Sequence, residues 1–317
     1  MKTQEGVSRR DFITDTRNSL NRRQFFAGSA VAGLVVAQAS SALRAAESPA
    51  GKMRKGACIG VFPREISVLE KFQIAKRAGF EGIEPNTLST KAEVEEYKQA
   101  AESTGLRIHS IMNSDHWKYP LSDSDPEVVK KCVEGIRTSL QNAHDLGADT
   151  VLLVPGVVTP AVRYSEVYAR SQKQIKDLLG MAKDLRVVIA IENVGNRFLL
   201  SPMEFVRYIE EFRSPWVRGY FDIGNLGANG YPQDWIRTID RQLTKVHIKR
   251  FEPGTDHPKF DPNDRRTQGI DWDAVRKALT DVKYQGWISA EVRNGDEAYV
   301  TEVSARMDKF LVGQSPV

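Results

Sequence analysis

The chain has 317 residues, with 45 Lys and Arg against 41 Asp and Glu and a formal net charge of +4. Residues 1–46 hold seven of the basic and three of the acidic residues, so 38 of each remain and residues 47–317 carry no net charge. A domain that follows a nucleic-acid backbone normally keeps a basic excess, so no nucleic-acid partner is expected. Cys58 and Cys132 are too few for a disulfide framework. We expect two buried thiols, with a single bridge as the alternative.

An export leader is predicted over residues 1–46. Arginine pairs at 9–10 and 22–23 precede an apolar, small-residue stretch at 25–43, which is the order of regions in a cleaved leader. Both pairs resemble the twin-arginine signal, and the second lies directly against the apolar stretch. We therefore expect the twin-arginine export machinery as a partner and a periplasmic or otherwise exported protein. An uncleaved membrane anchor is the alternative, although the apolar stretch is short for a span.

After the leader, short apolar runs alternate with longer amphipathic stretches. The run at 187–192 is apolar and rich in β-branched residues, which suits a strand buried on both faces of a parallel sheet. The predicted strands are 58–62, 82–84, 107–112, 150–154, 187–192, 217–222, 245–248 and 287–291.

Helices are predicted between these strands from amphipathic periodicity, with proline at helix starts and glycine after helix ends. They are 67–78, 91–103, 126–146, 165–185, 201–212, 232–241, 272–282 and 296–311. Eight strand–helix units over 47–317 predict one α/β domain, a single (β/α)8 TIM barrel. A doubly wound open sheet is the alternative, but no glycine-rich fingerprint follows the first strand.

Side chains that can bind a metal ion fall at the ends of the last four predicted strands. They are Glu192, Asp222, His247 and Glu291. The carboxyl ends of barrel strands converge on one mouth, so these side chains are expected to meet there. Three carboxylates and one imidazole suit one divalent ion, with Mn²⁺ expected and Mg²⁺, Co²⁺ or Zn²⁺ as alternatives. Each residue alone could instead cap a helix or form an ion pair.

A set of motifs spreads over most of the chain after the leader. They are GFEGIE at 79–84, IENV at 191–194, NRFLLSP at 196–202, YFDIGN at 220–225, GYP at 230–232, KVHIK at 245–249, IDW at 270–272 and AEV at 290–292. Together they resemble the xylose-isomerase-like sugar (phosphate) isomerases and epimerases. The resemblance is strongest to 3-epimerases of L-ribulose 5-phosphate and to hexulose-6-phosphate isomerases.

The resemblance implies that the four residues hold one divalent ion, which chelates neighbouring oxygens of a ketose or ketose phosphate and stabilises an enediolate. It also implies that Glu192 and Glu291 act as the catalytic pair, one removing a proton and the other returning one on the opposite face of the sugar carbon. One shared acid/base residue would instead suit an aldose–ketose isomerase. Relatives often pair, so a homodimer is expected.

Further contacts with the sugar substrate are expected from side chains near the same mouth. The candidates are Glu84, His109, His116, Arg197, Asn225 and Arg250, with Trp117, Lys118 and Arg293 as weaker ones. Many relatives have His where Asn225 stands, and Asn can hydrogen-bond a hydroxyl but cannot exchange a proton near neutral pH. Each candidate also has a structural interpretation, such as packing a loop.

Three other functions remain as alternatives. The first is a lyase or hydratase, in which the same metal and base eliminate the glycosidic oxygen of a keto-glycoside. Export favours an unphosphorylated substrate such as this. An endonuclease with a zinc cluster needs more than the five histidines of this chain. A non-catalytic sugar-binding barrel would not need four metal ligands at its strand ends.

Overall fold

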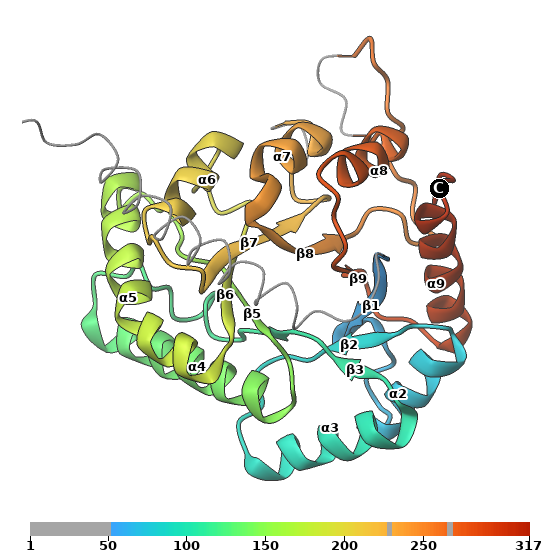
Figure 1. The fold of residues 1–317 in the computed structure, drawn as a ribbon, viewed down its shortest axis with the longest axis horizontal. Helices are drawn as coiled ribbons and strands as arrows, with labels where there is room; N and C mark the ends of the chain where they lie inside the picture. Colours follow the sequence, from blue (N-terminus) through green and yellow to red (C-terminus); the bar gives the residue numbers. More distant parts are fainter. Residues whose placement is uncertain (1–51, 227–229, 265–268) are drawn as a thin grey trace, which may run out of the picture. The chain divides into compact units, whose positions relative to one another are not determined.

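The computed structural model describes residues 52–226, 230–264 and 269–317. The predicted leader, residues 1–46, lies outside the described residues. The compact unit Ala50–Val317 alternates strands and helices along the chain, and the helices surround the strands (Figure 1). Within the three described ranges, no helix has the length and apolar character that a membrane span requires.

The strands form one parallel sheet in the order β3-β2-β1-β9-β8-β7-β6-β5-β4. They are β1 (Arg54–Cys58), β2 (Gly82–Glu84), β3 (Arg107–Ile108), β4 (Ile111–Met112), β5 (Thr150–Leu153), β6 (Val188–Glu192), β7 (Val217–Asp222), β8 (Leu243–Ile248) and β9 (Trp287–Ala290). The first strand therefore pairs with the last, from Arg54 opposite Trp287 to Ala57 opposite Ala290. The prediction of a single (β/α)8 barrel is confirmed.

The barrel is nearly closed because its two edge segments are consecutive in the chain. Only His109 and Ser110 separate β3, which pairs with β2, from β4, which pairs with β5. Two further backbone hydrogen bonds bridge this break: Met112 N donates to Pro85 O at 2.9 Å, and Thr87 N donates to Met112 O at 3.1 Å. The strand predicted at 107–112 is therefore split into two: its first half, β3, pairs with β2, and its second half, β4, pairs with β5.

The helices cover the outside of the barrel. They are α2 (Val68–Arg77), α3 (Lys91–Thr104), α4 (Pro126–Asp145), α5 (Tyr164–Leu185), α6 (Pro202–Glu210), α7 (Pro232–Ile239), α8 (Trp272–Asp281) and α9 (Glu297–Leu311). Local sequence fixes several starts: Ser67 and Thr90 form capping boxes with Glu70 and Glu93, each three residues further on. The main apolar core lies between these helices and the outward-facing strand residues.

The first strand differs from its prediction. We expected 58–62, the apolar run, but β1 ends at Cys58 and a short 3-10 turn, Ile59–Val61, follows. The basic residues Arg54 and Lys55 interrupt the apolar pattern by which strands were predicted, so the start of β1 was missed. Lys55 has a buried side chain whose ammonium reaches Ser304 Oγ at 2.7 Å and Asp308 Oδ1 at 2.6 Å on α9. A lysine that carries its charge to a partner in this way is compatible with a buried strand.

Polar side chains occupy much of the barrel interior. Lys245 on β8 is fully buried and its ammonium lies 2.8 Å from Asp149 Oδ1, next to the start of β5. Above this ion pair, His109 stacks on Trp287 with ring centroids 4.4 Å apart. Gly56 makes room for this layer, because a Cβ there would lie 2.7 Å from His109 Nε2. Side chains therefore fill the barrel interior, and an active site is expected at the carboxyl-end mouth.

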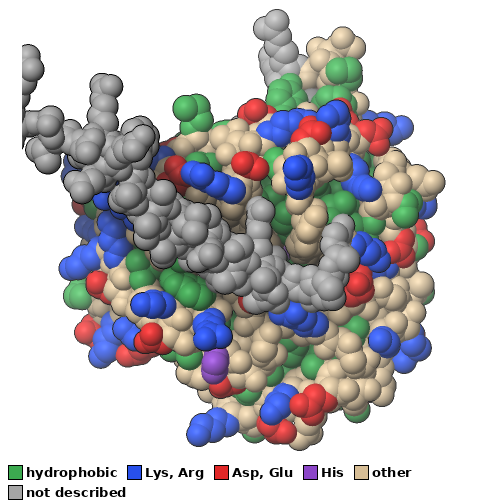
Figure 2. Space-filling view, in the orientation of Figure 1, with side chains coloured by type: hydrophobic (Ala, Val, Ile, Leu, Met, Phe, Trp, Pro, Cys, Tyr) green, Lys and Arg blue, Asp and Glu red, His purple; other side chains and the backbone are tan. Residues whose placement is uncertain are grey.

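The visible outer face carries both signs of charge. Figure 2 shows Lys and Arg side chains scattered among Asp and Glu side chains over the described residues on this side. This mixture agrees with the balanced charge of residues 47–317 in the sequence. Both cysteines are buried and free, so the expectation of two buried thiols is confirmed.

Candidate metal centre

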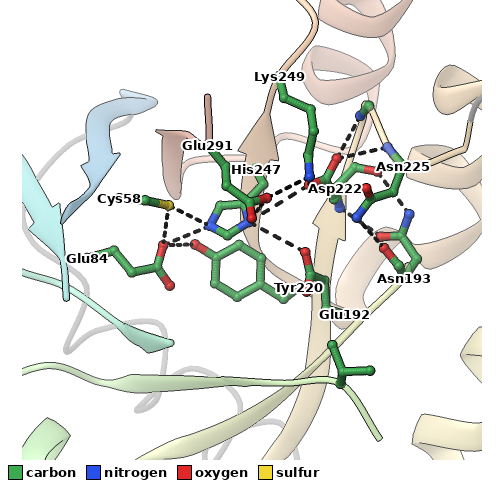
Figure 3. A network of polar contacts seen from close by, with 12 residues as sticks. Cys58, Glu84, Glu192, Asn193, Tyr220, Asp222, Asn225, His247, Lys249 and Glu291 are labelled. Carbon is green, nitrogen blue, oxygen red and sulfur yellow. Dashed lines mark hydrogen bonds and ion pairs between the residues drawn. The ribbon is translucent and has the colours of Figure 1, made fainter. Parts of the chain in front are cut away.

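Four side chains from consecutive strands meet at the carboxyl end of the barrel. Glu192 ends β6, Asp222 ends β7, His247 lies on β8, and Glu291 is the residue after β9. Each offers one ligand atom, and these atoms all lie within 4.8 Å of one another. Figure 3 shows the three carboxylates on the same side of the imidazole ring. We call these four residues the carboxylate–histidine cage.

The imidazole of His247 faces the carboxylates through Nδ1. This atom is 3.2 Å from Glu291 Oε2, 3.6 Å from Glu192 Oε1 and 3.9 Å from Asp222 Oδ2. It is buried and makes no hydrogen bond of normal geometry. Ligands at right angles around an ion with bonds near 2.1 Å are separated by about 3 Å. The separations and the unsatisfied nitrogen therefore fit a divalent ion among these atoms.

Glu84 holds the other nitrogen of the same ring. His247 Nε2 lies 2.8 Å from Glu84 Oε2, and the hydroxyl of Tyr220 donates to that oxygen at 2.7 Å. A carboxylate on one nitrogen fixes the tautomer and leaves the lone pair of the other nitrogen for a metal ion. Burial opposes ionisation of Glu84, but the charge of His247 outweighs it and lowers the pKa of Glu84 to about 2. Glu84 is therefore an ionised, fully buried hydrogen-bond acceptor.

Glu84 contacts His247 and Tyr220, and its expected contact with sugar hydroxyls stays a prediction. Figure 3 shows its carboxylate on the opposite side of the imidazole from Glu192 and Asp222. Cys58 adds to this group, with its sulfur 3.4 Å from His247 Nε2 and 3.7 Å from Glu84 Oε2. The 2.8 Å between nitrogen and oxygen is a hydrogen-bond distance, shorter than the roughly 3.3 Å between two ligands of a tetrahedral zinc ion. We therefore interpret this second cluster as a proton-linked support for His247.

Asp222 is positioned by the turn that follows β7 and by Asn193. Its Oδ1 accepts hydrogen bonds from the backbone of Gly224 at 2.7 Å and Asn225 at 2.9 Å, which turns Oδ2 toward the cage. The amide of Asn193 binds both backbone groups of Asp222, donating to its O at 2.9 Å and accepting from its N at 2.7 Å. Asn225 in turn donates to Asn193 O at 2.9 Å. The two asparagines thus join the ends of β6 and β7.

Lys249 is a member of the site that the sequence analysis did not select. Its ammonium lies 2.8 Å from Asp222 Oδ2 and 2.8 Å from Glu291 Oε2. Gly224 leaves the space for its stem, since a Cβ on that glycine would lie 2.2 Å from Lys249 Cγ. The alternation of a strand could have identified it, because residues two apart face the same side and Lys249 follows His247 by two.

The three carboxylates of the cage differ in pKa because their surroundings differ. Burial raises the pKa of Asp222 to about 8, the charge of Lys249 opposes this rise, and the charges of Glu291 and Glu192 add to it. Burial also raises the pKa of Glu192. At Glu291 the effect of burial is outweighed by the charges of His247 and Lys249, which hold its pKa well below the usual range. Crowded carboxylates of this kind retain protons that a divalent cation can replace.

The other two histidines named as sugar contacts differ in their surroundings. His109 lies inside the barrel, where its Nε2 is 3.0 Å from Ser289 Oγ, and burial lowers its pKa to about 3. Its expected contact with a sugar hydroxyl stays a prediction. His116 is also buried, with its Nδ1 accepting from Val154 N at 3.4 Å and its pKa lowered by burial to about 4. A neutral imidazole at His116 can still donate or accept a hydrogen bond.

The remaining candidates lie on loops after the strands. Arg197 is exposed and Arg250 is half-buried, and both have positive φ angles, of 60° and 66°. Arg293 is held by Pro253 O at 3.2 Å and Lys118 lies over the ring of Tyr119. Within the described ranges these side chains make no hydrogen bond or ion pair with the cage, so their role as sugar contacts stays a prediction.

The sequence and the fold match known proteins. A family described as xylose isomerase-like TIM barrel matches residues 72–309. L-ribulose-5-phosphate 3-epimerase UlaE of Escherichia coli (strain K12 / DH10B) is 27% identical over 203 residues, covering 59% of this chain and 69% of that protein. UlaE of Salmonella paratyphi A is also 27% identical, over 197 residues, with the same coverage.

Two solved structures show the same fold. The 3-keto-D-glucoside 4-epimerase YcjR from E. coli superposes with a TM-score of 0.67 at 20% identity, covering 82% of this chain and all of that one. A D-psicose 3-epimerase superposes with a TM-score of 0.66 at 18% identity, with 82% and 100% coverage. At these identities the likeness concerns the fold.

Proposed function

The chain belongs to the xylose isomerase-like TIM-barrel family, and from that premise we propose that it is a divalent-metal-dependent epimerase or isomerase of a ketose or related sugar. One observation carries the proposal: three carboxylates from β6, β7 and the end of β9 surround a buried imidazole nitrogen on β8 that has no hydrogen-bond partner, which makes four potential ligands. Pure sugar binding does not need such a site, whereas a divalent ion held there can acidify a carbon next to a carbonyl.

The carboxylate–histidine cage would hold one divalent ion, with Mn²⁺ preferred for its mainly oxygen shell. The bound ion would supply Lewis-acid polarisation of the substrate carbonyl. His247 would bind through Nδ1, because Nε2 is engaged by Glu84. Asp222 would bind through Oδ2, because Oδ1 is engaged by backbone N–H groups.

Glu192 and Glu291 are proposed as the proton-transfer pair. They belong to β6 and the end of β9, so two strands separate them and each enters the cage from its own strand. One carboxylate takes the proton from the carbon beside the carbonyl, which leaves an enediolate, and the other carboxylic acid returns a proton to the opposite face. The carbon is inverted, and the two glutamates exchange protonation states, so no oxidant or reductant is consumed.

Hydrogen exchange with solvent tests this proposal. The full chain with Mn²⁺ is incubated in D₂O with unphosphorylated ketoses and keto-glycosides, and the carbon beside the carbonyl is followed by NMR. We expect deuterium to enter at that carbon together with the epimeric or isomeric sugar. Release of the aglycone would instead identify a lyase. The absence of both exchange and product from every sugar, with the metal bound, would contradict an enzyme of this class.

We also propose that the protein is exported by the twin-arginine pathway, which favours an unphosphorylated substrate. The support is the sequence of residues 1–46, where the pair Arg22-Arg23 precedes the apolar stretch. Replacing both arginines by lysine should retain the protein in the cytoplasm, as measured by cell fractionation, while the same change at Arg9 and Arg10 should have a smaller effect. Equal export of all forms would contradict this route.

A further inference from the structure

Lys249 is held inside the site rather than extended into solvent. Its side chain is 24% exposed, and its ammonium contacts Asp222 Oδ2 and Glu291 Oε2 at 2.8 Å each. These are the same two oxygens that lie 3.9 Å and 3.2 Å from His247 Nδ1. Figure 3 shows the lysine descending onto the carboxylates from the side opposite Glu84. A divalent ion in the cage would therefore share both oxygens with this ammonium.

The ammonium of Lys249 changes the net charge of the cage with its ion bound. Glu192, Asp222 and Glu291 contribute three negative charges when ionised, and a divalent ion contributes two positive ones. A neutral His247 adds nothing, so the ammonium of Lys249 offsets the one negative charge that remains on the loaded cage, while the ionised Glu84 lies on the other side of the ring. A positive charge a few ångströms from a divalent cation repels it, and partial burial reduces the screening by water.

We propose that Lys249 is a built-in counter-cation, which weakens binding of the divalent ion and offsets the remaining negative charge of the loaded cage, so that the cage accommodates the negative charge of an enediolate. In the ion-free protein the same ammonium contacts both Asp222 and Glu291. The inference rests on the proposed function for the presence of a metal centre, but not for the identity of the sugar. A lysine that only oriented the two carboxylates would have the opposite effect on the affinity, because its loss would weaken metal binding.

The test compares the full chain with Lys249→Met, Lys249→Gln and Lys249→Arg. Mn²⁺ affinity is measured by calorimetric titration at neutral pH, and thermal unfolding is followed with and without Mn²⁺. We expect the two neutral variants to bind Mn²⁺ at least about ten-fold more tightly than wild type, and to unfold at lower temperature without the ion. The Arg variant keeps the charge and should bind within a few-fold of wild type. Turnover of the Met variant should fall although its metal binding is tighter.

Neutral variants that bind Mn²⁺ as wild type does, or more weakly, would overturn the inference. If the Met variant folds only in the presence of Mn²⁺, the ion has replaced the missing cation, and this result supports the inference. The Mn²⁺ affinity is then measured on the Gln variant. A wild-type chain that binds Mn²⁺ but exchanges no sugar proton would contradict the proposed function alone. The affinity comparison between the variants would still decide the role of Lys249.

Discussion

Glu192→Gln and Glu291→Gln should each lower the rate of epimerisation by roughly 10²–10⁴-fold, the usual contribution of a positioned acid or base. The amide keeps an oxygen that can bind an ion but cannot accept or return a proton. Two glutamates on separate strands also predict a directional defect. Each variant should still exchange the proton of the one epimer whose C–H bond faces the remaining glutamate, and should exchange the other epimer far more slowly.

The measurement is deuterium incorporation into each purified epimer, with Mn²⁺ at saturation for every variant. Glu96→Gln, at an exposed position on α3, is the matched control and should behave as wild type. If both cage variants exchange both epimers at equal rates, the two-sided assignment is wrong. A single shared base, as in an aldose–ketose isomerase, would then be favoured.

Glu84→Gln should weaken Mn²⁺ binding by roughly 10–100-fold, although Glu84 does not face the metal position. The carboxylate accepts from His247 Nε2 at 2.8 Å and lies on the opposite side of the ring from Nδ1. Its negative charge makes the imidazole a stronger ligand, and its geometry fixes the tautomer that presents Nδ1. A neutral amide provides less of both effects.

Two neighbours provide controls for this prediction. Tyr220→Phe removes one donor to Glu84 but leaves its charge, and Cys58→Ser changes a weak contact at 3.7 Å. Both should bind Mn²⁺ within a few-fold of wild type in the same calorimetric titration. Affinity that is unchanged in Glu84→Gln would show that the orientation of His247 does not depend on this carboxylate.

The barrel could be predicted because its signals are local. Apolar runs such as β6 and helix starts such as the Ser67 capping box are visible within a few residues. The metal-ligand candidates could also be found locally, since each stands at or next to the carboxyl end of a strand, and parallel barrel strands end at one mouth. The break between β3 and β4 could not, because it depends on hydrogen bonds to two different neighbouring strands.

The support of the cage depends on contacts between distant residues. Tyr220 and Glu84 are 136 positions apart, and His247 and Glu84 are 163 apart. No local pattern shows which strand-end carboxylates face His247 Nδ1 and which one faces His247 Nε2. Asn193 was overlooked for the same reason, since its function lies in the backbone of the adjacent strand at Asp222.

The metal content of the purified protein tests the central claim most directly. The full chain is dialysed against Mn²⁺, freed of unbound ion and analysed beside the double variant Glu192→Gln, Glu291→Gln, with Glu96→Gln as control. We predict one divalent ion per chain in the wild type and the control, and little or none in the double variant. A wild-type chain that remains free of metal in Mn²⁺, Co²⁺ and Zn²⁺ would contradict the metal centre and leave a barrel that binds sugars without transforming them.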